Sequence, residues 1–159
     1  MPDRNDPTPD AIADQRTIAD LLARYARATD ELASTEPEVR ERAARTYDEV
    51  FEPQARIGVR DQLSVEGASA WIDFVRRSNA GMRATQHLLG LPVVDLNGDA
   101  ATVTCSLQST QFGVQGEIVR VHANYEATAT RSGGSSWRLS TLTVEVLAID
   151  PPPSEERPT

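Results

Sequence analysis

The chain has no lysine, and all sixteen of its basic residues are arginines. Without a lysine amine the protein cannot form a Schiff base with a carbonyl substrate, anchor pyridoxal phosphate or supply the lysine of a phosphate-binding loop. Its 159 residues include a single cysteine, Cys105, so no disulfide can form within the chain. One cysteine and two histidines supply a tetrahedral zinc site poorly, and we expect no bound metal.

Other absences narrow the choice of partner and location. Acidic residues outnumber basic ones by 24 to 16, and there is no basic patch, so we expect no nucleic-acid partner. No apolar run approaches the roughly 20 residues of a membrane span, and the first ten residues lack the apolar core of a signal peptide. We therefore expect a cytoplasmic protein without a membrane partner. No GxGxxG motif opens a helix, which argues against a dinucleotide site, and we expect no cofactor.

The sequence predicts one folded domain, residues 10–150, between two disordered tails. Residues 1–9 are rich in Pro and Asp, and residues 151–159 in Pro and Glu, a composition that can bury little apolar surface. Within the domain, apolar residues recur first with the period of a helix and later with the period of a strand. Helices followed by a long antiparallel meander indicate an α+β fold.

Three helices are predicted in the first half of the chain. The first runs from about Asp10, its expected N-cap, to Thr29. The second follows Thr35-Glu36-Pro37, whose threonine is the expected cap, and ends at Pro53. The third covers Gly67–Arg77. Residues expected to be buried on these helices are Ile18, Leu21, Leu22, Tyr25, Ala28, Val39, Ala43, Tyr47, Val50, Trp71, Phe74 and Val75.

The strands lie mainly in the second half. The predicted strands are Ala55–Val59, Arg83–Leu96, Ala100–Phe112, Glu117–Thr130 and Trp137–Ile149. Asn97-Gly98 is a strong signal for a tight hairpin turn, and Ser132-Gly133-Gly134-Ser135 indicates a second hairpin. A curved sheet wrapped on helices would leave a pocket between the two layers.

Several short segments, taken in order, resemble the SnoaL-like branch of the NTF2-like superfamily. They are Leu22–Ala28 followed by Asp30, Phe51–Ala55, Thr85-Gln86-His87, Pro92-Val93-Val94, Asn97–Val103 and Trp137-Arg138-Leu139, which together span about residues 12–149. The resemblance implies an α+β cone, in which a strongly curved antiparallel sheet wraps on about three N-terminal helices around a central cavity. Such proteins often dimerise through the sheet, so we expect a homodimer. Members include scytalone dehydratase, bile-acid 7α-dehydratase, ketosteroid isomerase and polyketide cyclases, besides non-catalytic proteins.

The resemblance also implies which residues are catalytic. Asp30 and His87 match the Asp–His pair of the dehydratases. Tyr25 matches the catalytic tyrosine of the bile-acid dehydratase, in the same Tyr-x4-Asp relation. His122 resembles the second histidine of scytalone dehydratase, and Tyr47 resembles a tyrosine that holds a water there.

Three further residues qualify this picture. Trp71 is, with Tyr47, a candidate for binding substrate, although packing in the core is the simpler role for it. Thr29 stands where scytalone dehydratase has a tyrosine, which argues against a scytalone-like substrate. Gln54 replaces the aspartate usual in the F-x-x-D-A segment, a change that we interpret as structural.

These residue types suit proton transfer. A carboxylate bonded to one imidazole nitrogen fixes the tautomer and leaves the other nitrogen for substrate, and Asp30 and His87 could form such a pair. Tyr25 and Asp30 lie about 140° apart around an ideal helix, so we expect the helix to loosen near Asp30 if both face one pocket. Strand alternation places Thr85 on the same face as His87. His122 shares a face with Arg120, Asn124 and Glu126, which could line a polar cavity or contact solvent.

The leading hypothesis is a cofactor-independent dehydratase, isomerase or cyclase that acts on an apolar polycyclic or polyketide-like small molecule. His87 would be the general base, oriented by Asp30, while Tyr25 would donate to a carbonyl or leaving oxygen and His122 would assist as an acid. The alternative is a non-catalytic NTF2-like module that binds a ligand or a partner subunit. A lone strand histidine is more often structural than catalytic, and Tyr25 could simply be a core residue.

Overall fold

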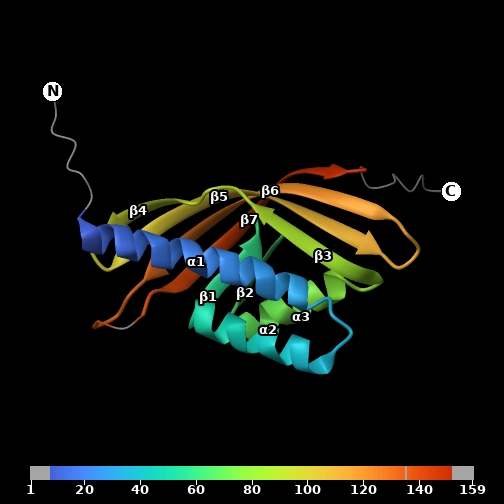
Figure 1. Cartoon of the computed structure of the whole chain (residues 1–159), viewed down its shortest axis with the longest axis horizontal. Coiled ribbons are helices and arrows are strands. Elements are labelled where there is room, and N and C mark those ends of the chain that lie inside the picture. Colours follow the sequence, from blue (N-terminus) through green and yellow to red (C-terminus); the bar gives the residue numbers. More distant parts are fainter. Residues whose placement is uncertain (1–7, 135, 152–159) are drawn as a thin grey trace.

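The computed structural model describes residues 8–134 and 136–151. In this part of the chain three helices cover one face of a curved, seven-stranded sheet (Figure 1). The helices are α1 (Pro9–Glu31), α2 (Pro37–Val50) and α3 (Ala68–Ser78). The strands are β1 (Phe51–Val59), β2 (Leu63–Glu66), β3 (Met82–Leu89), β4 (Val93–Asn97), β5 (Ala100–Gly113), β6 (Ile118–Thr130) and β7 (Arg138–Asp150). The predicted α+β class is confirmed, including the order of helices and meander.

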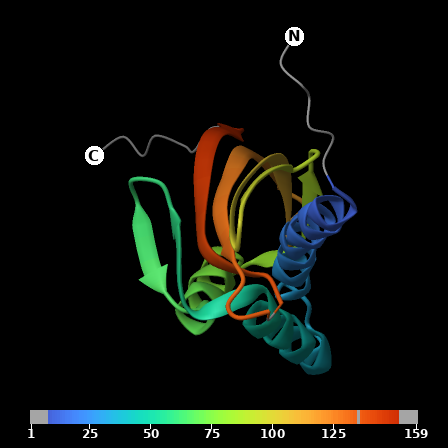
Figure 2. The same ribbon diagram turned by 90° about the vertical axis from the view of Figure 1, so that its left-hand side faces the viewer.

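The sheet is mixed rather than wholly antiparallel. Its strand order is β2-β1-β7-β6-β5-β3, and β4 also pairs with β5. Strands β1 and β7 run parallel, whereas the other neighbours are antiparallel. Parallel strands need a long connection, which the intervening chain provides because α3 and the meander lie between β1 and β7. Figure 2 shows the resulting curvature, with the helices on the concave side and the β1–β2 hairpin beside them.

Two strand predictions need correction. The predicted strand Arg83–Leu96 is really two strands, β3 and β4, separated by Gly90-Leu91-Pro92. Both pair with β5, and they are separate because the proline has no N–H to donate. The hairpin between β4 and β5 is confirmed, although its two-residue turn is Gly98-Asp99, one position later than predicted. The short strand β2 was not predicted.

The helix ends also differ from prediction. Thr8, not Asp10, caps α1, because its Oγ1 accepts a hydrogen bond from the amide of Ala11 at 3.2 Å. Glu36 rather than the preceding threonine is the N-cap of α2. That helix ends at Val50, and Pro53 lies inside β1. The predicted tails, apart from the residues at their inner ends, fall outside the described residues.

The core fills the space between the helices and the concave face of the sheet. Its largest fully buried side chains include Tyr47, Tyr125, Phe51, Ile18, Leu22 and Leu142. None of the helices in the described part of the chain is both long and apolar enough to span a bilayer.

Candidate functional site

A cavity of about 150 Å³ lies between the concave face and the helices α1 and α3. Its polar lining residues are Tyr25, Thr29, Ser78, Asn79, His87, Ser109, Gln111 and Tyr125. Its main apolar lining residues are Trp71, Phe74, Val75, Leu107, Val121 and Val144. Most of the polar groups come from α1 and neighbouring strands of the sheet, whereas α3 contributes an aromatic wall and, at its C-terminal end, Ser78 and Asn79. The cavity therefore combines an apolar interior with a few groups that can move or hold a proton.

Asp30 and His87 form the pair that the sequence predicted. Asp30 lies in the last turn of α1 and His87 in β3, and Asp30 Oδ1 is 2.6 Å from His87 Nδ1. A carboxylate can only accept, so Nδ1 carries the hydrogen and Nε2 is the basic nitrogen of the neutral ring. The side chains are largely covered, with 11% of His87 and 24% of Asp30 exposed.

The Asp30 carboxylate accepts two more hydrogen bonds from β3. Thr85 Oγ1 donates to Oδ1 at 3.0 Å, and the backbone amide of His87 donates to Oδ2 at 3.0 Å. These bonds compensate for placing a negative charge at the C-terminal end of a helix, where the helix dipole opposes it. They also hold the carboxylate in one orientation, and hence the imidazole that it contacts.

The second ring nitrogen of His87 is available to a ligand. Nε2 forms no hydrogen bond within the described residues, and no buried side-chain nitrogen or oxygen among them lacks a partner. Nε2 is therefore accessible, and His87 lines the cavity. A base held by a carboxylate and open to an apolar cavity is the arrangement that proton abstraction requires.

The structure corrects the predicted geometry of α1. The helix stays regular through Glu31, and the amide of Leu32 still bonds to the carbonyl of Ala28 at 3.0 Å. It does not loosen near Asp30, because Asp30 does not need to reach the cavity: it contacts His87 from behind and is absent from the lining. Tyr25 and Thr29, one turn apart, face the cavity instead.

Tyr25 is a buried hydrogen-bond donor in the cavity wall. Its hydroxyl accepts a hydrogen bond from Trp71 Nε1 at 3.0 Å, which leaves the hydroxyl hydrogen for another partner. Burial raises the pKa of Tyr25 to about 12, although hydrogen bonds with Trp71, Thr29 and Tyr125 act in the opposite direction. Tyr25 therefore keeps its proton at neutral pH and can donate to a substrate oxygen, but cannot act there as a base.

Tyr47 does not contact the cavity, contrary to the prediction that it binds substrate. It is fully buried, and its ring packs edge-on against that of Tyr25 at 5.5 Å. Its hydroxyl lies 2.7 Å from Thr29 Oγ1, which itself donates to the Tyr25 carbonyl at 2.9 Å. Because Thr29 has only one hydrogen to donate, Tyr47 must be the donor to Thr29. Tyr47 thus supports a lining residue.

His122 lies on the opposite face of the sheet. It is exposed, whereas its neighbours in β6, Val121 and Ala123, line the cavity. Successive residues of a strand point to opposite faces, so His122 cannot turn inward without a shift in register. Of the two placements that the sequence allowed for His122, the structure shows the one outside the cavity, so His122 is not in position to assist there as an acid.

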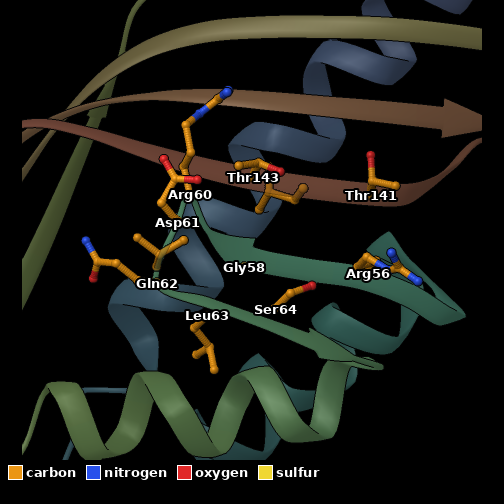
Figure 3. Close-up of a pocket in the computed structure, with 11 residues that line it drawn as sticks. Arg56, Gly58, Arg60, Asp61, Gln62, Leu63, Ser64, Thr141 and Thr143 are labelled. Carbon is orange, nitrogen blue, oxygen red and sulfur yellow. The ribbon is translucent and has the colours of Figure 1, made fainter.

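A second hollow lies beside the β1–β2 hairpin, with a volume of about 530 Å³ (Figure 3). Arg56 and Arg60 lie at its opposite ends. Arg60 already forms ion pairs with Glu126 and Glu145, at 2.6 Å and 3.6 Å. The hollow has no acid/base pair like that of the smaller cavity. Across residues 8–134 and 136–151, no three His, Cys, Asp or Glu side chains gather where they could hold a metal ion.

Sequence reasoning missed several cavity residues. Ser109 and Gln111 of β5 lie opposite His87 and Thr85 in the sheet register, and Tyr125 of β6 lies further along the same face. Strand alternation gave their parity, but only the pairing register shows which residues adjoin His87. The role of Thr85 was also missed, although its position two residues before His87 places it on the same face.

Comparisons with known proteins agree with this fold. A family model described as the SnoaL-like domain matches residues 10–143. The chain belongs to the SnoaL-like family. No curated protein sequence matches it. All the solved structures described next are less than 25% identical to this chain, so they support the SnoaL-like fold and not a shared activity.

Three solved structures illustrate the likeness. The hexachlorocyclohexane dehydrochlorinase LinA-type3 from Novosphingobium barchaimii is 15% identical, with a TM-score of 0.75 over 94% of this chain and 97% of its own. A candidate scytalone dehydratase from Novosphingobium aromaticivorans is 13% identical, with a TM-score of 0.70 over 93% and 91%. An NTF2-like superfamily protein from Salmonella enterica is 12% identical, with a TM-score of 0.71 over 93% and 99%.

Proposed function

We propose that this SnoaL-like protein is a cofactor-independent acid/base enzyme, a dehydratase, isomerase or cyclase, acting on an apolar small molecule. The observation that carries the proposal is the Asp30–His87 pair, whose free ring nitrogen is accessible from a largely apolar cavity.

In the proposed reaction, His87 Nε2 removes a proton from a carbon next to an electron-withdrawing group such as a carbonyl. The imidazolium that forms is stabilised by the Asp30 carboxylate at Nδ1. Tyr25 donates its hydroxyl hydrogen to the oxygen on which negative charge develops. A neutral donor suits this task, because Tyr25 holds its proton tightly.

His87 can then return the same proton. If a hydroxyl leaves from the neighbouring carbon, the C–O bond breaks, a C=C bond forms and the imidazolium proton leaves with the hydroxide as water. If the proton returns to a different carbon, the product is an isomer. One group can act as base and then as acid, so no second histidine in the cavity is required.

The fold relatives are compatible with this chemistry. One neighbour is a dehydrochlorinase and another a candidate dehydratase, and both names denote eliminations. Their low identity makes them support for the reaction class only, since one fold serves many functions.

A substrate-independent assay tests the base directly. In heavy water, a positioned base exchanges the hydrogens beside a ketone carbonyl for deuterium, which NMR detects without any net reaction. We would screen ketones and β-hydroxy ketones of one to four rings, following exchange by NMR and elimination by the absorbance of the conjugated product. Activity should appear with at least one ketone and fall at least about 100-fold in His87→Ala.

The matched control is His122→Ala, which removes the other histidine from the outer face and should leave the rate within about twofold. Equal rates in the wild type and His87→Ala would contradict the proposal. A protein that binds panel members but exchanges no deuterium would instead be the non-catalytic ligand-binding module.

A further inference from the structure

We infer that the cavity selects a neutral molecule of about one ring, which narrows the substrate class within the proposed function and rests on it. The polycyclic substrate expected from the family resemblance does not fit the observed space. The cavity measures about 150 Å³, whereas pockets for drug-sized ligands usually occupy about 300–1,000 Å³. An apolar cavity of about 150 Å³ is large enough for a benzene ring.

The walls of the cavity are fixed by packing, so the limit on size is built into the fold. Trp71 stacks on Phe74 with ring centroids 4.9 Å apart, and its indole nitrogen is bonded to Tyr25. The Tyr25 ring in turn packs edge-on against those of Phe51 and Tyr125, both at 5.5 Å. Enlarging the cavity on this side would break several buried aromatic contacts at once.

The lining also disfavours a ligand that carries a net charge. Among the described residues, no Asp, Glu or Arg side chain lines the cavity, and the only histidine that does so is His87. An ionised carboxylate or phosphate on the ligand would lose its hydration without gaining a guanidinium partner. The Asp30 carboxylate, behind His87, is already bonded to His87 and Thr85.

The distribution of polar groups suits a ligand whose oxygen lies on one side of its ring. Tyr25, Thr29, His87 and Ser109 lie on the side formed by α1 and the strands, whereas Trp71, Phe74 and Val75 of α3 form an apolar wall. A ring with a carbonyl or hydroxyl on one side can place that oxygen by the tyrosine and its apolar edge against Trp71. The exposed Ser78, at the C-terminal end of α3, marks where the cavity reaches solvent.

The test is a binding series that does not depend on turnover. It compares cyclohexanone, decalone and a four-ring steroid ketone, with the fluorescence of Trp71 as the reporter. The variant Asp30→Asn slows any reaction without altering the size of the cavity, because Asp30 does not line it. The only other tryptophan, Trp137, does not line the cavity and is replaced in a Trp137→Phe background. Thermal shifts of the unmodified chain provide a second measurement that needs no tryptophan variant.

Cyclohexanone should bind best, decalone at least about tenfold more weakly and the steroid not measurably. This order is diagnostic, because apolar surface alone would make affinity rise with every added ring. Cyclohexanecarboxylate should bind at least about tenfold more weakly than cyclohexanone, since its charge finds no partner. Tighter binding of the steroid than of cyclohexanone, equal binding of the carboxylate, or no binding of cyclohexanone at its solubility limit would each overturn the inference.

A variant that opens the wall sharpens the test. Phe74→Ala removes one ring of the stacked pair, and the affinity for decalone should rise at least about tenfold. The control is Phe112→Ala, since Phe112 does not line the cavity and should leave the order unchanged. The binding order does not depend on catalysis. Deuterium exchange tests whether His87 is a base, whereas the ring series tests the size of the cavity.

Discussion

The two faces of the sheet place the two histidines of this chain in opposite environments. His87, on the concave face, contacts a carboxylate through Nδ1 and opens onto an apolar cavity. His122, on the convex face, is exposed and lies opposite Gln108 and Ala148 in the neighbouring strands. The residue type is the same, so the difference between the two environments comes from the face of the sheet and from the partner.

The convex face carries its own polar contacts, but they lead to no cavity of catalytic character. Glu145 accepts a hydrogen bond from Asn124 at 3.3 Å and pairs with Arg60, and Ser106 donates to Asn124 at 3.0 Å. These groups are partly exposed, so water screens their interactions and each contributes little. Hydrogen bonding alone does not make a site; a covered base with a free nitrogen does.

Removing a carboxylate from each face should give the largest contrast. Asp30→Asn keeps the shape but replaces a charged acceptor of Nδ1–H with an amide, so the imidazole loses its fixed tautomer and the imidazolium loses its counter-charge. Deuterium exchange should fall about 100- to 1,000-fold. Glu145→Gln, the matched change on the convex face, should alter the rate less than twofold. Equal losses in the two variants would show that the dyad has no special role.

Neighbouring residues of β7 allow the same comparison for stability. Leu142 is fully buried on the concave side, while Thr143 points to the other face. Leu142→Ala should cost about 2–5 kcal/mol, which lowers Tm by roughly 5–20 °C in a chain of this size. Thr143→Ala should cost about 0.5 kcal/mol or less. Calorimetry measures both, and similar losses would mean that the two faces share the core.

The free energy of unfolding should fall at alkaline pH because of the concave side, where all three tyrosines are buried. Burial raises the pKa of Tyr25 from 10.0 to about 12, and raises those of Tyr47 and Tyr125 well above their ordinary value. The folded state thus holds protons that the unfolded state releases above pH 10. Stability is complete below pH 10 and falls as the pH rises to 12, by about 3 kcal/mol for a shift of two units.

Phenolate absorbance and circular dichroism, followed together from pH 9 to 12, check this prediction. No lysine titrates in this range, so the tyrosine signal is simple to interpret. The phenolate signal should rise only as the protein unfolds. A tyrosine that ionises near pH 10 in a folded protein would contradict the burial of all three.

Substitutions on the convex face should have the smallest of these effects, and the property that they change is self-association of the protein. The family resemblance predicts a homodimer through the sheet, which stays a prediction. Leu88, Val93 and Ile118 are 54%, 60% and 43% exposed, and outward-facing apolar residues favour such a contact. Leu88→Asp should weaken self-association in sedimentation experiments, whereas Val114→Asp, in the β5–β6 loop, should not. A monomeric wild-type protein would contradict the prediction.

The features that could be predicted from the sequence are those that depend on residues close together in the chain. The helices and the β4–β5 and β6–β7 hairpins were predicted because apolar periodicity and turn residues act within a few positions. The break at Gly90-Leu91-Pro92 and the parallel pairing of β1 with β7 were not, since both depend on strands far apart in the chain. The Asp30–His87 pair was predicted from a resemblance, but the hydrogen bond from Thr85 was not.

The sequence by itself determined the α+β class and the helical and strand periods. Its lack of lysine also excluded Schiff-base chemistry and a phosphate-loop lysine. The sequence also placed one acid and one base where a known family has them. Only the tertiary structure decided that His87 and not His122 faces the cavity, and that Asp30 contacts the ring of His87 from behind. The physical reason is that strand register and sheet curvature fix which side chains meet. Both arise from contacts between distant segments that no local pattern specifies.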